Sequence, residues 1–98
     1  MAIEKRVEPE YILRLFITGA TPNSVKAVTN IRSICEEHVR GKYSLEIVDL
    51  YSHREMAEQE QVVAVPMLMK MFPLPAQKLI GDMSNNKKVL EALGIIID

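Results

Sequence analysis

The chain has 98 residues, of which 48% are hydrophobic, and a formal net charge of −1. This length suits a single hydrophobic core, so we expect one domain over residues 1–98, with residues 1–9 as a loose tail. The near-neutral charge argues against nucleic-acid binding, which needs a basic surface, and against electrostatic docking on a membrane.

The N-terminal stretch, MAIEKRVEPEY, mixes acids and bases before any apolar segment, which is unlike a secretory signal. No apolar run approaches the roughly 18 residues that cross a membrane. The single cysteine, Cys35, has no intramolecular partner for a disulfide, which fits a reducing compartment. We therefore expect a soluble cytoplasmic protein.

The first predicted element is a strand over residues 11–18, YILRLFIT, in which Arg14 is the only charged residue. An almost continuous apolar run is typical of a strand that is covered on both faces, and this favours a central position in a parallel arrangement. Gly19 begins the break that follows the strand.

A helix is expected over residues 24–40, because apolar side chains recur there at spacings of three and four. Either Thr21 caps this helix, with Pro22 in its first position, or Asn23 caps it one turn later. Gly41 is a good helix stop. The predicted apolar stripe consists of Val25, Val28, Ile31, Ile34, Cys35 and Val39.

The rest of the chain predicts three strands and two helices. Residues 44–50, SLEIVDL, indicate a strand near a sheet edge, and residues 51–61 a polar helix too short to be stable without packing. Strands are expected over residues 67–72 and 78–81, antiparallel to each other across a proline turn, and Ser84 is expected to cap a final helix. Strand alternation places two sets of side chains on opposite faces, Met67, Met69 and Met71 on one and Leu68, Lys70 and Phe72 on the other.

This order of elements, βαβαββα, is that of an α/β thioredoxin-like domain, but the usual redox site is missing. In such folds a Cys-x-x-Cys thiol at the start of the first helix is activated by the helix N-terminus. Here residues 19–24 read GATPNS, and Cys35 lies about three turns further on, where a small core residue is expected. Ser24 is better interpreted as a capping or turn residue than as a glutathione-activating hydroxyl.

No other catalytic or ligand set is evident. His38 and His53 lie far apart, without cysteines or paired carboxylates at metal-ligand spacing. Asp49 lies at a predicted strand end and Asp82 in a predicted turn, and these structural positions account for both carboxylates. We therefore expect no catalytic residue, no cofactor and no metal.

The sequence resembles the KaiB family, found in bacterial circadian clocks and in simpler KaiB–KaiC operons. The matching segments extend from about residue 10 to residue 93. They are the first strand with Gly19, Thr21-Pro22-Asn23-Ser24, the strand end Val48-Asp49, Ala64-x-Pro66-x-Leu68, the turn Pro73-x-Pro75, and Ile80-Gly81-Asp82-x-Ser84-Asn85.

This resemblance implies a non-enzymatic adaptor that binds the N-terminal ATPase ring of a KaiC-like protein in a circadian, timing or stress system. A histidine kinase or another clock-output protein is a further partner class. The family also changes fold: the thioredoxin-like state binds KaiC, whereas a second state rearranges the C-terminal half and assembles as a homotetramer. A homodimer or a homotetramer is therefore expected beside the monomer.

By analogy to the family, the partner-contact surface in the thioredoxin-like state includes Glu55, Gln59 and Glu60 of the short polar helix, together with Lys26. The edge strand is a second candidate surface, represented by Ser44 and Glu46, because an edge offers unpaired backbone groups.

Three residues are expected to influence the fold state: Pro66, Ala92 and Gly94. Ala92 stands where many relatives have glycine, and alanine favours a helix interior by about 0.5–1 kcal/mol. Gly94 then suits a C-cap. The β-branched residues 95–97 oppose this by favouring a strand. The rival interpretation from another functional class is a thioredoxin-like redox or glutathione-dependent enzyme that lacks the usual cysteines.

Overall fold

A computed structural model of the protein describes residues 9–96. Its elements are β1 (Tyr11–Ile17), α1 (Pro22–His38), β2 (Tyr43–Asp49), α2 (Arg54–Gln59), β3 (Met67–Phe72), β4 (Gln77–Ile80) and α3 (Asn86–Leu93). This is the predicted thioredoxin-like order, with a helix rather than a strand near the C-terminus. Of the predicted N-terminal tail, residues 1–8 lie outside the described residues, as does Ile97 of the strand-prone segment.

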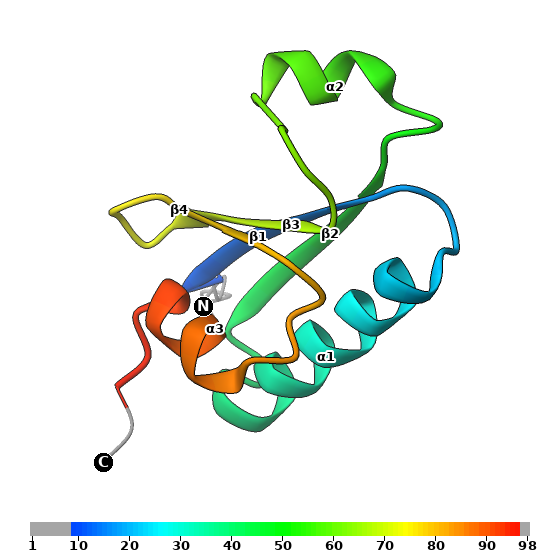
Figure 1. Ribbon diagram of the computed structural model, residues 1–98. Helices are drawn as coiled ribbons and strands as arrows, with labels where there is room; N and C mark the ends of the chain where they lie inside the picture. Colours follow the sequence, from blue (N-terminus) through cyan, green and yellow to red (C-terminus); the bar gives the residue numbers. More distant parts are fainter. Residues whose placement is uncertain (1–8, 97–98) are drawn as a thin grey trace, which may run out of the picture.

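The four strands form one sheet in the order β2-β1-β3-β4. β1 runs parallel to β2 and antiparallel to β3, which in turn pairs antiparallel with β4. The central position predicted for the first strand and the edge position predicted for the second are both confirmed. Helices α1 and α3 lie on one side of the sheet and α2 lies on the other (Figure 1).

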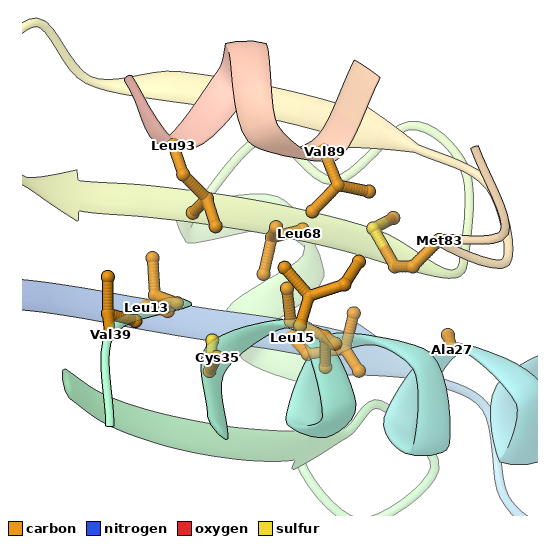
Figure 2. Packing of buried hydrophobic residues seen from close by; sticks show 11 residues of the cluster. Leu13, Leu15, Ala27, Cys35, Val39, Leu68, Met83, Val89 and Leu93 are labelled. Atoms are coloured by element: carbon orange, nitrogen blue, oxygen red, sulfur yellow. The ribbon is translucent and has the colours of Figure 1, made fainter. Parts of the chain in front are cut away.

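Each face of the sheet carries its own hydrophobic cluster. The larger cluster fills the space between the sheet and helices α1 and α3, with Leu13, Leu15 and Leu68 contributed by the strands (Figure 2). The smaller cluster lies on the opposite face, where Phe16 and Met67 are buried and Met56 of α2 packs against them. A helix as short as α2 is marginal in isolation, so this contact supplies the packing it needs.

Helix α1 begins at Pro22 with Thr21 as its cap, which confirms the first of the two predicted caps. The Thr21 hydroxyl oxygen accepts a hydrogen bond from the Ser24 backbone N–H at 3.2 Å, and Pro22 opens the first turn. The predicted apolar stripe is wrong at Val25, whose side chain is 52% exposed. Ser24 and Ala27 are buried instead, because the helix turns the face of residues 24, 27, 31 and 34–35 toward the sheet.

The predicted alternation along β3 is interrupted by a bulge. The pairing between β1 and β3 shifts register between Ile12 and Leu13, so that Phe72 pairs with Ile12 and Lys70 with Leu13. Paired residues share a face of the sheet, so Phe72 stands on the face of Ile12 and not with Lys70 as predicted. Lys70 is buried on the face that α1 and α3 cover.

The predicted cap of the last helix is displaced by one residue. The Ser84 backbone N–H donates to Asp82 Oδ1 at 3.0 Å, within a turn, and the side chain of Asn85 accepts from the Lys88 N–H at 3.2 Å. Asn85 is therefore the N-cap. The C-cap prediction is confirmed, since Gly94 has the left-handed conformation with φ of 77°.

Candidate functional site

The loop between β1 and α1 meets the start of β3 at the end of the sheet where a thioredoxin-like redox site would lie. A cavity of about 400 Å³ is present there, lined by Thr18, Thr21, Pro22, Asn23, Ser24, Val65 and Pro66. Pro66 is buried and follows a cis peptide bond. The Ser24 hydroxyl oxygen accepts hydrogen bonds from the Thr18 N–H and the Thr21 hydroxyl, at 3.3 and 2.8 Å. Ser24 therefore holds the turn together.

Cys35 is fully buried within the larger cluster, as predicted for a small core residue. Burial, together with the nearby Glu36 carboxylate, raises the pKa of its thiol to about 12. The thiolate is the nucleophilic form of cysteine, so this side chain is unsuited to thiol–disulfide chemistry. Among the described residues no three His, Cys, Asp or Glu side chains gather closely enough to hold a metal ion.

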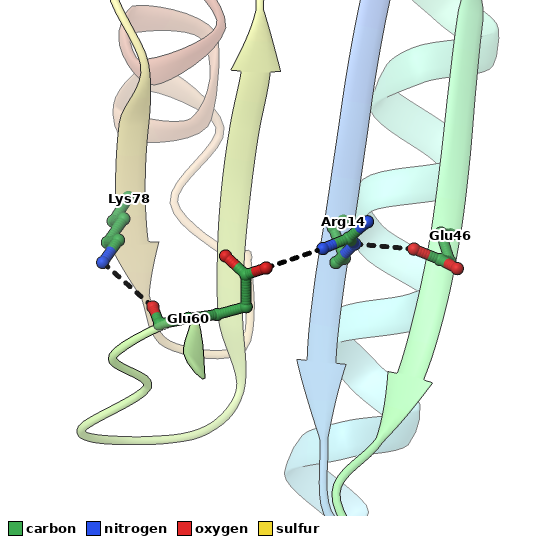
Figure 3. A network of polar contacts seen from close by, with 4 residues as sticks. All are labelled: Arg14, Glu46, Glu60 and Lys78. Carbon is green, nitrogen blue, oxygen red and sulfur yellow. Dashed lines mark hydrogen bonds and ion pairs between the residues drawn. The ribbon is translucent and has the colours of Figure 1, made fainter. Parts of the chain in front are cut away.

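On the α2 side of the sheet, the guanidinium of Arg14 in β1 contacts two carboxylates. Its Nε donates to Glu46 Oε1 of β2 at 2.6 Å, and its Nη1 donates to Glu60 Oε1 at 3.2 Å (Figure 3). The backbone oxygen of Glu60 also accepts from Lys78 Nζ at 3.2 Å. Glu46 and Glu60, assigned to two separate candidate surfaces from the sequence, are therefore neighbours on one face.

Arg14 was not predicted as part of a surface. The one feature of the sequence that could have pointed to Arg14 is that it is the only charged residue of an otherwise apolar strand. A partly buried cation is stabilised by a partner, but the partners lie 32 and 46 residues away and cannot be identified from sequence spacing.

The remaining candidates on this side are solvent-exposed. Glu55 and Gln59 are exposed on α2, and Ser44 is exposed on β2. Within residues 9–96 only β1 pairs with β2, so the outer edge of that strand is available to a partner. Glu60, the C-cap of α2, and Glu46 of β2 thus lie on either side of Arg14.

Lys26 lies elsewhere. It is exposed on α1, which covers the opposite side of the sheet from α2 (Figure 1). The pKa of the Asp82 carboxyl is lowered chiefly by hydrogen bonding from Ser84, and Lys26 adds a smaller favourable charge. Lys26 therefore faces the loop after β4, and the structure does not place it beside Glu55 or Gln59.

Asp49, at the end of β2, fixes the loops at this end of the sheet. Its Oδ1 accepts from the backbone N–H of Gly19 at 3.1 Å and from that of Tyr51 at 2.9 Å. The Tyr51 ring lies so close that a Cβ at Gly19 would approach it to 3.1 Å, and Gly19 itself has a φ of 61°. Both the close contact and the left-handed conformation favour glycine at position 19.

The residues expected to influence the fold state all lie in the second half of the chain. Pro66 directly precedes β3, Ala92 is partly buried in the last turn of α3, and Gly94 caps that helix.

None of the three helices in residues 9–96 has the length and apolar character that crossing a membrane would require.

Comparison with known proteins gives a consistent result. The model of the KaiB domain family matches residues 14–95. The circadian clock oscillator protein KaiB of Gloeothece citriformis is 39% identical over 88 residues, which cover 90% of this chain and 83% of that protein. KaiB of Synechococcus elongatus is 40% identical over 86 residues, covering 88% of this chain and 84% of the relative.

Solved structures support the same fold. The N-terminal domain of Synechococcus elongatus SasA superposes with a TM-score of 0.72 at 20% identity, covering 96% of this chain and 91% of that domain. Mitochondrial thioredoxin 3 of Saccharomyces cerevisiae superposes with a TM-score of 0.70 at 11% identity, covering 90% and 80% of the two chains. At this identity the likeness shows the fold alone, and nothing here favours the rival interpretation of a redox enzyme.

Proposed function

The chain belongs to the KaiB family, and we propose that it is a non-enzymatic adaptor that binds the N-terminal ATPase ring of a KaiC-like protein. The observation that carries this proposal is the junction of Glu46 and Glu60 through Arg14. It joins α2 and the edge strand β2 into one surface with exposed polar side chains and a strand edge that no other strand of residues 9–96 covers. We further propose that the protein acts in the cytoplasm, within a circadian or simpler timing or stress system.

The proposed contact has two parts of different chemistry. The exposed side chains of α2, Glu55 and Gln59, offer a carboxylate and an amide to polar or basic groups of the ATPase. The outer edge of β2 offers backbone N–H and C=O groups, which an extended segment of a partner can pair with. A further partner, such as a histidine kinase or another clock-output protein, is proposed to use the same surface.

The first experiment is copurification with the cognate KaiC-like ATPase in ATP, in ADP and without nucleotide. We expect a complex in at least one of these states. Absence of binding in all three would contradict the adaptor function. An insulin-reduction or glutathione-conjugation assay should show no turnover that depends on Ser24 or Cys35, and turnover lost in Ser24→Ala would instead support an enzyme.

A second experiment locates the surface on the protein. Glu55→Lys combined with Gln59→Ala is expected to weaken the complex, because the change reverses the charge and shortens the polar contacts on α2. Glu37→Lys is a matched control, since this exposed carboxylate lies on α1 on the other side of the sheet. If Lys26→Glu weakens binding while the α2 variant does not, the contact surface lies on α1 instead.

We also propose that the second half of the chain can adopt the rearranged fold of the family. Ala92 favours α3 by about 0.5–1 kcal/mol relative to glycine, which corresponds to a population shift of about two- to fivefold. NMR secondary-structure assignment of residues 52–95 in Ala92→Gly tests this proposal. We expect the population of a strand-containing state to increase, and an unchanged helix over residues 86–93 with no minor state would contradict it.

A further inference from the structure

The segment between α2 and β3 presents apolar side chains at the surface. Val63 is 85% exposed, and Ala64 is exposed beside it. Single apolar residues are common on protein surfaces and need no explanation. These two, however, directly precede Val65 and Pro66, which line the cavity opposite the loop between β1 and α1. An exposed apolar stretch and a cavity therefore adjoin at this end of the sheet.

The main-chain groups in the middle of this segment have no main-chain partner in the described part of the protein. The segment is fixed at its start, where the Val62 N–H donates to Ala57 O at 2.8 Å. It is fixed again at its end, where Pro66 O accepts from the Gly81 N–H at 2.9 Å. Between these points, the N–H and C=O groups of residues 63–65 make no hydrogen bond with another main-chain group within residues 9–96. These groups are available to water or to a ligand.

The segment is held in place although its middle is unpaired. Val62 and Val65 pack against the smaller hydrophobic cluster, which contains Phe16 and Met67. Binding groups that are already ordered lose less conformational entropy when a ligand arrives. An extended peptide is the ligand that matches them, because its own N–H and C=O groups can pair with the main chain while its side chains fill adjacent pockets.

The cavity determines which side chain such a peptide can insert. Its volume of about 400 Å³ has room for a side chain, and no charged residue lines it. Pro22, Val65 and Pro66 supply apolar walls, whereas Thr18 and Asn23 supply a hydroxyl and an amide. A charge that enters a site without a charged partner loses hydration and gains little in return. The cavity therefore favours a neutral side chain over a carboxylate, an ammonium or a phosphate.

This end of the sheet also lies between two candidate contact surfaces that the sheet separates. Strands β1 and β2 end here and β3 begins here, because β1 is parallel to β2 and antiparallel to β3. Helix α2 leads into residues 62–66, and α1, which carries Lys26 near its start, follows the loop on the other wall of the cavity (Figure 1). A single partner that contacts both Lys26 and α2 has to cross this end.

We propose that residues 63–65 and the adjacent cavity form a docking site for an extended segment of the KaiC-like ATPase. Main-chain groups of that segment pair with residues 63–65, and a neutral side chain of the segment enters the cavity. The inference rests on the proposed adaptor function. It adds a contact that is distinct from the polar side chains of α2 and from the edge of β2.

Hydrogen exchange of the free protein and of its complex with the ATPase, followed by mass spectrometry, tests the main-chain pairing. The amides of residues 63–65 are expected to exchange quickly in the free protein and at least about tenfold more slowly in the complex. The amides of Leu74 and Ala76, in the turn at the opposite end of β3, are the control and should not change. A complex in which residues 63–65 exchange as before would overturn the docking site and leave the adaptor function intact. Absence of any complex would contradict both.

Two variants test the side-chain contacts. Val63→Glu places a charge beside the unpaired main chain, and Asn23→Trp fills the cavity, so each is expected to raise the dissociation constant at least about tenfold. Both positions are exposed, and circular dichroism should show an unchanged fold. Leu74→Glu is the matched control, because Leu74 is 75% exposed and lies far from the cavity in the turn after β3. Binding as tight as that of the wild type in either Val63→Glu or Asn23→Trp would overturn the proposal.

Discussion

The ammonium of Lys70 lies beneath the C-terminal cap of α3, where a Cβ at Gly94 would stand 3.6 Å from Lys70 Nζ. Lys70 belongs to β3 and is only 4% exposed. The last carbonyl groups of a helix carry a partial negative charge, which a nearby cation stabilises. Lys70 Nζ therefore lies close to the end of α3, and both its charge and its packing are expected to stabilise that helix end.

Substitution of Lys70 should separate these two contributions. Lys70→Met keeps most of the side-chain volume and removes the charge, so the free energy of unfolding is expected to fall by no more than about 1 kcal/mol. Lys70→Glu places a buried carboxylate against the negative end of α3 and should cost about 3 kcal/mol or more. Urea denaturation followed by circular dichroism measures both. Equal losses in the two variants would mean that the charge of Lys70 is irrelevant.

Gly94 should tolerate few other residues, because its φ is 77°. Gly94→Ala forces a side chain into the left-handed region and is expected to lower the free energy of unfolding by about 1–2 kcal/mol. Asparagine visits this region more readily, so Gly94→Asn should lose clearly less. The Cβ that either variant adds at position 94 would stand at an ordinary contact distance from Lys70 Nζ, so no steric clash contributes to the loss. Thermal unfolding of the two variants compares them, and an equal or larger loss for asparagine would contradict the explanation by backbone strain.

Arg14 should hold the segment after α2 against the sheet. Arg14→Met removes both ion pairs while preserving an apolar stem, and we expect a loss of about 1 kcal/mol in the free energy of unfolding. The loss should become smaller at high salt. Hydrogen exchange should increase over residues 54–61 more than over β2, because α2 has few other anchors. Arg40→Met, which removes an exposed ion pair between Glu36 of α1 and the residue after the helix cap, is the control and should change neither segment.

The central position of β1, the edge position of β2 and the boundaries of most elements could be predicted from the sequence, because apolar runs, alternation and capping residues are local signals. The apolar run of β1 indicated a central strand, and Thr21-Pro22 and Gly94 marked the ends of α1 and α3. The exact face of α1 could not be predicted. Spacings of three and four fit a stripe through Val25 as well as one through Ala27, and only the sheet beneath decides between them.

The features of the candidate surface that escaped prediction all depend on contacts between distant segments. The bulge that moves Phe72 beside Ile12 arises from the register between β1 and β3, which the sequence of β3 alone does not specify. The pairing of Arg14 with Glu46 and Glu60 likewise requires the fold. The separation of Lys26 from α2 is a third case, since it follows from the placement of the two helices on opposite sides of the sheet.

The buried thiol of Cys35 makes stability depend on pH in the alkaline range. Its pKa is about 12 in the folded protein against an ordinary value of 9.0. The unfolded chain therefore releases the thiol proton at a lower pH than the folded protein does. Above pH 9 the unfolded state binds fewer protons, so the free energy of unfolding falls as pH rises toward 12. Below pH 9 this contribution is fully present and constant.

Cys35→Ala removes the titrating group at the cost of a small cavity, so the difference in stability between wild type and variant should be constant from pH 7 to 8.5 and should shrink between pH 9 and 11. Urea denaturation at each pH measures the difference, and the use of a difference cancels the titration of groups that do not interact with Cys35. A difference that does not change with pH would mean that Cys35 ionises in the folded protein as readily as in the unfolded chain.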